Sequence, residues 1–262
     1  MTIAKIVDLK CKGIILLGLM AERPAQAFRI LSLALFNRPY IRELVGLRPH
    51  KLWLERAGIQ TVIDIGAHTG SFAYAARSYL PLAQIYSFEP LADCYQILIR
   101  NLNRGGRFQA FNVALGNEQG ETAIQRSEFS PSSSILPMAE AHKQAFPWTA
   151  KTEPVPVRIQ RLDDFAEQLR LERRVLLKID VQGYEMEVLQ GGMDTLNAID
   201  YVNVECSFQV LYKGQASFHQ VYEFLTSRGF AYAGSWGQMF SPRDGSILQI
   251  NALFVRSPGS KE

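Results

Sequence analysis

From residue 61 onward, short apolar segments alternate with longer segments whose apolar residues recur at helical spacing. This alternation is typical of a parallel sheet covered by helices on both faces. Right-handed crossovers place the first three strands side by side, with their carboxyl ends opening on one edge. We expect strands at 61–66, 83–90, 107–115, 155–160, 174–180, 201–206, 230–236 and 246–256, and helices at 71–80, 92–104, 162–170, 185–192 and 216–229.

The stretch from 116 to 154 breaks the alternation and is rich in Ser, Pro and polar residues. We expect a hairpin with a mobile loop, inserted between the third and fourth strands. The "SPSSS" segment at 130–134 has two interpretations, an ordinary flexible loop or a lid that contacts a substrate. Ser133 is the candidate contact under the second interpretation.

The chain divides by charge near residue 60. Residues 1–60 hold ten Lys or Arg against four Asp or Glu, although the whole chain carries only +3. We predict an N-terminal helical extension over 1–58 and a main domain over 59–258. The extension either covers the main domain or contacts a membrane surface or a second copy of the chain. A further alternative is a signal peptide, with "GIILLGLMA" as its apolar segment. Nucleic acid is not an expected partner, because no aromatic-studded basic stripe accompanies the charge.

The cysteines and histidines form no recognisable metal or disulfide pattern. Cys11, Cys94 and Cys206 are odd in number and far apart, and no histidine lies at a metal-ligand spacing from them. Free thiols in a reducing compartment fit best, so we expect a cytoplasmic protein without a bound metal. His142 is expected at the surface.

Polar residues follow the first three strands, where the carboxyl ends of parallel strands share one edge. "DIGAHTG" follows the first strand, and its glycines permit close approach of the backbone to a ligand. The spacing lacks the G-x-G-x-x-G of dinucleotide sites, and an acid before the glycines suits a cationic nucleoside better than a pyrophosphate. Glu89 ends the second strand, where a carboxylate can accept both hydroxyls of a ribose. Asn112 ends the third, within reach of a nucleobase edge.

Two charged residues interrupt the apolar strand in "LLKIDVQGYEMEVLQG". Lys178 and Asp180 lie among Leu176, Leu177 and Ile179, and an isolated charge in a dry interior costs several kcal/mol or more. Both therefore need a partner, a water-filled cleft or a ligand. Lys178 has two candidate partners, Asp180 and Glu205, and the pair is either catalytic or a contact that only joins strands.

Five segments together resemble the FkbM family of S-adenosylmethionine-dependent methyltransferases. They are "VIDIGAHTGSF", "YSFEP", "FNVALGNEQGET", "RLDDF" and "LLKIDVQGYEMEVLQG", in this order, and the resemblance spans about residues 60 to 255. It implies an α/β, Rossmann-like class I methyltransferase fold with a seven-stranded, mostly parallel sheet and an antiparallel last strand. It also implies methyl transfer, usually to a hydroxyl of a sugar or natural product, with S-adenosylmethionine as cofactor.

The resemblance also assigns roles to individual residues. Asp64, Gly66, His68 and Gly70 would surround the methionine part of the cofactor, Glu89 the ribose, and Asn112 the adenine. We take Asp180 as the group that orients or deprotonates the acceptor, with Lys178 as a second catalytic candidate, and Ser133, Gln182, Tyr184 and Glu205 as acceptor contacts. The chain departs from the family pattern at two positions. His68 stands where the family usually has Asn. Gln182 stands where the family usually has Glu, and a glutamine cannot supply a carboxylate.

Two classes of function remain open. The favoured one is an O-methyltransferase acting on a small-molecule or glycan hydroxyl. The rival is a nucleoside-binding or scaffold protein of the same fold that has lost turnover, an idea suggested by Gln182 and by the N-terminal extension. An NAD-dependent reductase is disfavoured by the glycine spacing.

Overall fold

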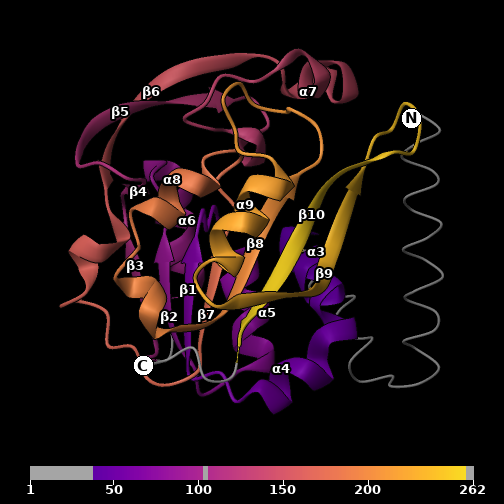
Figure 1. The fold of residues 1–262 in the computed structure, drawn as a ribbon. Coiled ribbons are helices and arrows are strands. Elements are labelled where there is room, and N and C mark those ends of the chain that lie inside the picture. Colours follow the sequence, from indigo (N-terminus) through magenta and orange to yellow (C-terminus); the bar gives the residue numbers. More distant parts are fainter. Residues whose placement is uncertain (1–37, 103–105, 258–262) are drawn as a thin grey trace.

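The computed structural model describes residues 38–102 and 106–257, and it contains a seven-stranded sheet in the order β3-β2-β1-β7-β8-β10-β9 (Figure 1). Strands β3, β2, β1, β7 and β8 pair in parallel, whereas β10 runs antiparallel to both of its neighbours. The strands are β1 (Thr61–Ile65), β2 (Gln84–Phe88), β3 (Phe108–Phe111), β7 (Val175–Ile179), β8 (Ile199–Ser207), β9 (Phe230–Phe240) and β10 (Ile247–Arg256). The predicted fold class and antiparallel last strand are therefore confirmed.

Helices cover both faces of this sheet, as Figure 1 shows. The helices are α3 (Arg38–Leu47), α4 (Lys51–Ala57), α5 (Ser71–Tyr79), α6 (Ala92–Leu102), α7 (Glu140–Ala145), α8 (Glu185–Gln190) and α9 (Phe218–Thr226), with short 3-10 turns η1 (Arg48–His50), η2 (Ser130–Ser132), η3 (Pro147–Thr149), η4 (Leu162–Phe165) and η5 (Thr195–Ala198). Strand residues alternate between the faces, so neighbours in β1 belong to different cores. Val62 packs with α3, α4, α5 and α6, whereas Ile63 packs with α8 and α9.

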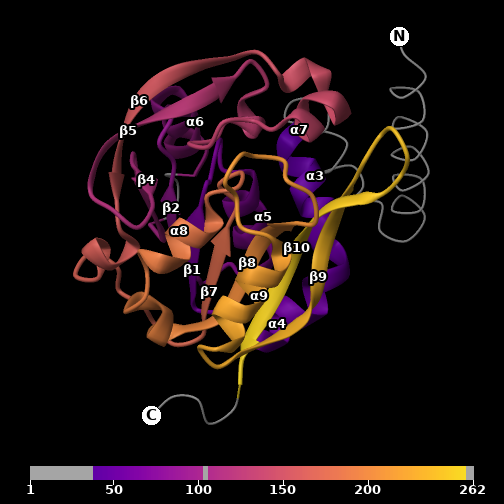
Figure 2. The ribbon, with the colours of Figure 1, turned by 45° about the horizontal axis from the view of Figure 1, so that its top comes forward.

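The insertion forms a second, three-stranded sheet in the order β4-β6-β5. Its strands are β4 (Ala114–Leu115), β5 (Gly120–Ser127) and β6 (Thr152–Gln160), and β5 and β6 pair antiparallel as the predicted hairpin. The connection between them carries η2, α7 and η3 and lies above the main sheet in Figure 2. A salt bridge between Arg126 and Asp93, with nitrogen-to-oxygen distances of 2.5 and 2.9 Å, joins β5 to the first turn of α6.

The prediction of one strand over 107–115 was wrong, because the segment divides between the two sheets. Strand β3 ends at Phe111, and β4 begins at Ala114 in the smaller sheet. Between them, the Asn112 amide donates hydrogen bonds of 2.9 Å to the carbonyl oxygens of Glu89 and Pro90. These bonds turn the chain away from β2.

The helix predicted over 162–170 was also wrong, since only the 3-10 turn η4 forms there. Its acidic residues cap neighbouring turns: Asp164 accepts from the backbone N–H of Arg161, and Asp163 accepts from those of Asp194 and Thr195. Side chains that bond to nearby backbone compete with helix propagation.

His142 was predicted at the surface and is instead 3% exposed. Helix α7 holds its ring between those of Phe146 and Tyr212, at centroid distances of 5.3 and 5.1 Å. Burial lowers the pKa of His142 to about 4, which favours the neutral ring in this apolar contact.

Part of the predicted N-terminal extension lies outside the described residues, namely 1–37. The remainder, α3 to α4, packs on the main domain through Leu47, Leu54 and Ala57, which join the core cluster of α5 and α6. Within the described part of the chain, no helix has both the length and the apolar character required to cross a bilayer. The boundary at 58 stays a prediction.

Candidate functional site

The turn after β1 brings the backbone of two strands into contact. Gly66 has φ +76°, and a Cβ placed on it would lie 1.8 Å from the carbonyl oxygen of Asp180. The backbone N–H groups of Gly66 and Ala67 both donate to the carbonyl of Phe88, at 3.1 and 3.0 Å. A glycine is therefore required here by the close approach of β7. Gly70 has φ +91°, and a Cβ there would meet the side chains of Leu98 and Leu102.

Glu89 lies directly after β2, and its carboxylate is hydrogen-bonded to the same turn. Its Oε2 accepts from the backbone N–H of His68 at 2.7 Å, and its Oε1 accepts from that of Leu91 at 2.8 Å. Burial raises the pKa of Glu89 to about 7, against the lowering effect of these two hydrogen bonds. The carboxylate is 4% exposed, and each oxygen keeps a second lone pair for a ligand hydroxyl.

His68 has φ +50°, a left-handed conformation in which asparagine is better tolerated than most residues. Its ring Nε2 lies 2.8 Å from the hydroxyl of Ser130 in η2. The insertion therefore contacts the turn after β1 directly, and it does so through His68, one of the two residues that depart from the family pattern.

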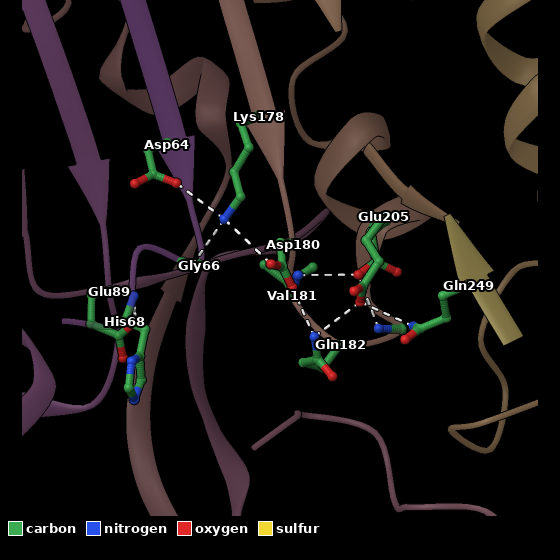
Figure 3. A network of polar contacts seen from close by, with 12 residues as sticks. Asp64, Gly66, His68, Glu89, Lys178, Asp180, Val181, Gln182, Glu205 and Gln249 are labelled. Carbon is green, nitrogen blue, oxygen red and sulfur yellow. Dashed lines mark hydrogen bonds and ion pairs between the residues drawn. The ribbon is translucent and has the colours of Figure 1, made fainter. Parts of the chain in front are cut away.

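Lys178 links the two halves of the site (Figure 3). Its Nζ lies 3.2 Å from Asp64 Oδ1 and 3.5 Å from Asp180 Oδ2, and it donates to the carbonyl of Gly66 at 3.3 Å. Burial alone would lower the pKa of Lys178, but the carboxylates of Asp64 and Asp180 raise it above its ordinary value. Lys178 thus pairs with Asp180, as one of the two sequence readings had it, and also with Asp64, which the sequence did not indicate.

A second polar network continues from Asp180 to β8 and β10. The Gln182 amide Nε2 donates to Asp180 Oδ1 at 2.7 Å and to Glu205 Oε2 at 2.9 Å. Gln249 in β10 donates to the same Glu205 oxygen at 3.0 Å. Tyr212 donates its hydroxyl proton to Gln182 Oε1 at 2.8 Å. Figure 3 shows Asp180, Gln182, Glu205 and Gln249 on one side of Lys178, with Glu89 and His68 on the other.

Burial dominates the protonation of the acids behind this network. It raises the pKa of Glu205 well above its ordinary value, and the negative charges of Asp180 and Glu185 add to the effect. It also raises the pKa of Glu185 to about 7, although Glu185 Oε1 accepts from the backbone N–H groups of Val181 and Gly183. The site therefore favours protonated carboxyl groups more than an exposed cluster would.

The structure does not bring every candidate residue together. Asp180, Lys178, Gln182, Glu205, Asp64 and Gly66 are joined in one network, and Glu89, His68 and Asn112 lie around the ends of β2 and β3. Ser133 accepts from the backbone N–H of Ser127 at 3.1 Å, within the insertion. Tyr184 is buried in a separate apolar cluster with Leu91 and Ile159.

Several site residues were missed by sequence reasoning. Ser134 donates to the carbonyl of Gln182 at 2.7 Å, and Tyr212 and Gln249 bond to the network from distant parts of the chain. Glu43 in α3 lies near enough to Lys178 for that charge to lower its pKa, which burial raises. The only sequence signal was the place of Ser134 in "SPSSS"; the other three stand in no motif.

The residues at the strand ends fit an adenosine-containing cofactor. Both hydrogens of the Asn112 amide are used by backbone carbonyls, so its oxygen is the end of the side chain that can accept from a base amino group. Glu89 offers a buried carboxylate for two hydroxyls. Asp64 is fully buried, and apart from the ion pair with Lys178 its oxygens lack hydrogen-bond partners. Burial raises the pKa of Asp64, and the charge of Lys178 acts in the opposite direction.

This sheet order, with a glycine turn after the first strand and a carboxylate after the second, is that of the class I methyltransferase fold. A family model described as the methyltransferase FkbM domain matches residues 64–232. The chain belongs to the FkbM methyltransferase family.

Named relatives agree with this assignment. The chain is 30% identical over 177 residues to the 2-O-methyltransferase NoeI of Sinorhizobium fredii, a match that covers 63% of this chain and 71% of that protein. It is 26% identical to the hexuronic acid methyltransferase AglP of Haloferax volcanii, over 63% of this chain and 64% of that one. It is 24% identical to the 31-O-demethyl-FK506 methyltransferase FkbM of Streptomyces tacrolimicus, over 78% and 82%.

Two solved structures are also similar. One is an FkbM methyltransferase from Methylobacillus flagellatus, with a TM-score of 0.48 and 12% identity, covering 76% of this chain and 44% of that chain. The other is the plantazolicin methyltransferase BpumL in complex with SAH, with a TM-score of 0.46 and 11% identity over 97% and 98%. The family assignment rests on the sequence matches.

Among residues 38–102 and 106–257, no group of three or more His, Cys, Asp or Glu side chains could hold a metal ion.

Proposed function

We propose that this methyltransferase transfers a methyl group to a hydroxyl of a sugar, glycan or natural product. The observation that carries the proposal is the position of Asp180: it follows β7, and its carboxylate is bound through Lys178 to the turn after β1. A proton acceptor is thereby fixed beside the place of the methyl donor. The names of NoeI, AglP and FkbM, which include two O-methyl positions and a hexuronic acid, support a hydroxyl-bearing acceptor.

The cofactor half of the site comprises the turn after β1 and the ends of β2 and β3. Glu89 accepts the two ribose hydroxyls, and the Asn112 oxygen accepts from the adenine. The Gly66–Gly70 turn, with Asp64 beneath it, surrounds the methionine part. His68 sets the geometry of this turn through its backbone N–H, which donates to Glu89.

Methyl transfer is an in-line displacement for which S-adenosylmethionine, when bound, supplies an activated methyl group. The protein must align the acceptor oxygen and remove its proton. Asp180 Oδ2 accepts this proton as the oxygen attacks. Lys178 stays charged and holds Asp180 in place, while Gln182 binds the other Asp180 oxygen. Lys178 is accordingly a positioning residue in this proposal.

The test combines binding with product detection. Calorimetric titration should show binding of S-adenosylmethionine and S-adenosylhomocysteine but not of NAD. Incubation with methyl-labelled S-adenosylmethionine and a panel of sugars, uronic acids and polyols should give an O-methylated product by mass spectrometry. Binding without transfer to any member of a broad panel would favour the rival, a scaffold that has lost turnover. Label found only on nitrogen would contradict the proposal.

The biological setting is a separate matter. A cytoplasmic location, and contact of the N-terminal helices with a membrane surface or a second copy, stay predictions. A membrane contact driven by the basic segment should weaken in high salt, because the Debye length falls from about 10 Å at 0.1 M to about 3 Å at 1 M.

A further inference from the structure

Gln182 adopts an unusual backbone conformation directly after β7. Its φ is +57°, and Gly183 follows at +101°. A residue with a Cβ seldom adopts the left-handed region, so surrounding contacts must hold it there. The hydroxyl of Ser134 supplies one such contact by donating to the Gln182 carbonyl at 2.7 Å. This places the insertion and the end of β7 in a fixed relation.

The side-chain amide of Gln182 uses its polar atoms within the protein. Both N–H groups are given to carboxylates, at 2.7 Å to Asp180 and 2.9 Å to Glu205. Tyr212 donates to the amide oxygen at 2.8 Å, and its proton is shared with the carbonyl of Ser132 at 3.1 Å. A flipped amide would direct its oxygen at two carboxylates, so the surroundings fix a single orientation.

These contacts leave particular oxygens for an acceptor. Asp180 is bound by Gln182 on Oδ1 and by Lys178 on Oδ2, and its side chain is 33% exposed. Glu205 accepts from both Gln182 and Gln249 on the same oxygen, Oε2. The other oxygen, Oε1, is consequently the one that can contact a substrate. The amide of Gln182 lies between the two acids and neutralises neither.

We propose that Gln182 is a positioning residue that holds Asp180 and Glu205 at a fixed separation, so that both face one acceptor. This inference rests on the proposed methyl transfer, and it revises the sequence-based expectation that Gln182 itself contacts the acceptor. An amide suits the task because it offers two donors without charge. A glutamate in its place would put three carboxylates together, a donor set that attracts a hard divalent cation.

The test uses variants of the full chain and a readout that does not need the acceptor. Gln182→Met keeps the length of the side chain and removes both donors. In protein labelled with 13C at the Glu carboxyl carbons, the NMR titration midpoint of Glu205, assigned with Glu205→Gln, should rise by roughly one pH unit in Gln182→Met, since hydrogen bonds to an anion lower its pKa. S-adenosylhomocysteine affinity should remain within about twofold of wild type.

Gln182→Glu provides the second arm and covers the case in which the Met variant fails to fold. It should bind Mn²⁺ at micromolar to submillimolar concentrations by electron paramagnetic resonance, at least tenfold tighter than wild type. With an acceptor identified in the product screen, the acidic limb of the rate profile should move to higher pH in both variants.

The results separate this inference from the proposed function. An unchanged Glu205 midpoint in Gln182→Met, with only a lower melting temperature, would show that Gln182 merely stabilises the loop, and Mn²⁺ binding as tight in wild type as in Gln182→Glu would also overturn the inference. Absence of methyl transfer in the wild-type protein would instead refute the proposed function, while the titration result would stand.

Discussion

At the scale of single residues, acids that look alike in the sequence have different surroundings in the site. Glu89 is buried and bonded to two backbone N–H groups, whereas Asp180 is partly exposed and bonded to a cation and an amide. Glu185 is buried and bonded to loop backbone. Only Asp180 combines exposure with a position beside the glycine turn, so it is the acid best placed to meet an acceptor.

Asp180→Asn should lower the methylation rate by roughly 10²–10⁴-fold, the usual range for loss of a general base. The amide keeps the shape of the side chain but cannot take a proton. Cofactor affinity and melting temperature should change little. Steady-state rates and S-adenosylhomocysteine titration check this, with Glu187→Gln on the next helix as a control. Poor cofactor binding by Asp180→Asn would show that Asp180 is a cofactor ligand or a structural partner of Lys178 instead.

Glu89 should make cofactor binding depend on pH. Its pKa is raised to about 7 by burial, and the ionised form is the better acceptor for two ribose hydroxyls. The dissociation constant for S-adenosylhomocysteine should therefore increase about tenfold from pH 8 to pH 6, as the ionised fraction falls. Calorimetry at several pH values measures this directly.

Two variants complete the Glu89 prediction. Glu89→Ala should weaken binding by about 1.5–3 kcal/mol at pH 8, as expected for lost charge-assisted hydrogen bonds. Glu89→Gln should bind weakly with no pH dependence near 7. The assignment of Glu89 to the ribose would be refuted by wild-type affinity in Glu89→Ala.

At the scale of elements, helix α3 does more than cover the core. The hydroxyl of Tyr40 donates to the carbonyl of Thr69 in the turn after β1, at 2.7 Å, and Asn101 of α6 donates to the same hydroxyl. Tyr79 donates to the carbonyl of Leu44 at 2.9 Å, farther along α3. The same helix is therefore bonded to the turn after β1, to α6 and to α5.

These two tyrosines give a matched pair of variants. Tyr40→Phe should lower stability by about 1–2 kcal/mol, because the carbonyl of Thr69 loses its donor in a partly buried place, and should weaken S-adenosylhomocysteine binding several-fold. Tyr79→Phe removes one hydrogen bond from the same helix and should cost similar stability with unchanged affinity. Equal affinities in the two variants would show that the contact of α3 with the turn after β1 does not support cofactor binding.

The sequence predicted the elements whose pattern is local. Strands β1, β2, β7 and β8 and helices α5, α6 and α8 appear close to their expected bounds because apolar periodicity and glycine turns act within a few residues. The break at Asn112 and the loss of the helix at Asp163 depend on side chains bonding to backbone across the fold. Tyr212 follows β8 and Gln249 lies in β10, and they meet Gln182 and Glu205 only in the folded chain, so no local pattern predicts their roles.

At the scale of the whole molecule, the site holds several buried carboxyl groups whose ionisation is unfavourable. The seven-stranded sheet brings Glu89, Glu185 and Glu205 to one end, where burial raises the pKa of each. The favourable contacts that compensate come from the backbone turns, Lys178 and, in the proposed function, the cofactor. The unliganded protein should thus be least stable at the pH values at which these acids must ionise.

This predicts how stability changes with pH. Unfolded glutamates have a pKa of about 4.3, whereas Glu89 and Glu185 have a pKa of about 7 in the folded protein. Between these values the folded state binds more protons than the unfolded state, so stability falls as pH rises. The contribution is fully present below about 4.3 and is lost as pH passes through about 7. The pKa of Glu205 is also raised, so its ionisation lowers stability in the same direction.

The melting temperature without cofactor should therefore fall by roughly 5–15 °C from pH 5.5 to pH 8, given about 2–4 °C per kcal/mol for a chain of this size. Glu185→Gln keeps an oxygen that accepts from Val181 and Gly183, so it should remove its share of the slope, whereas the exposed Glu140→Gln should not. Saturating S-adenosylhomocysteine should flatten the slope, because ribose hydroxyls stabilise the Glu89 anion. Scanning calorimetry across this window decides the matter, since a melting temperature that rises with pH would mean that the buried acids ionise without cost.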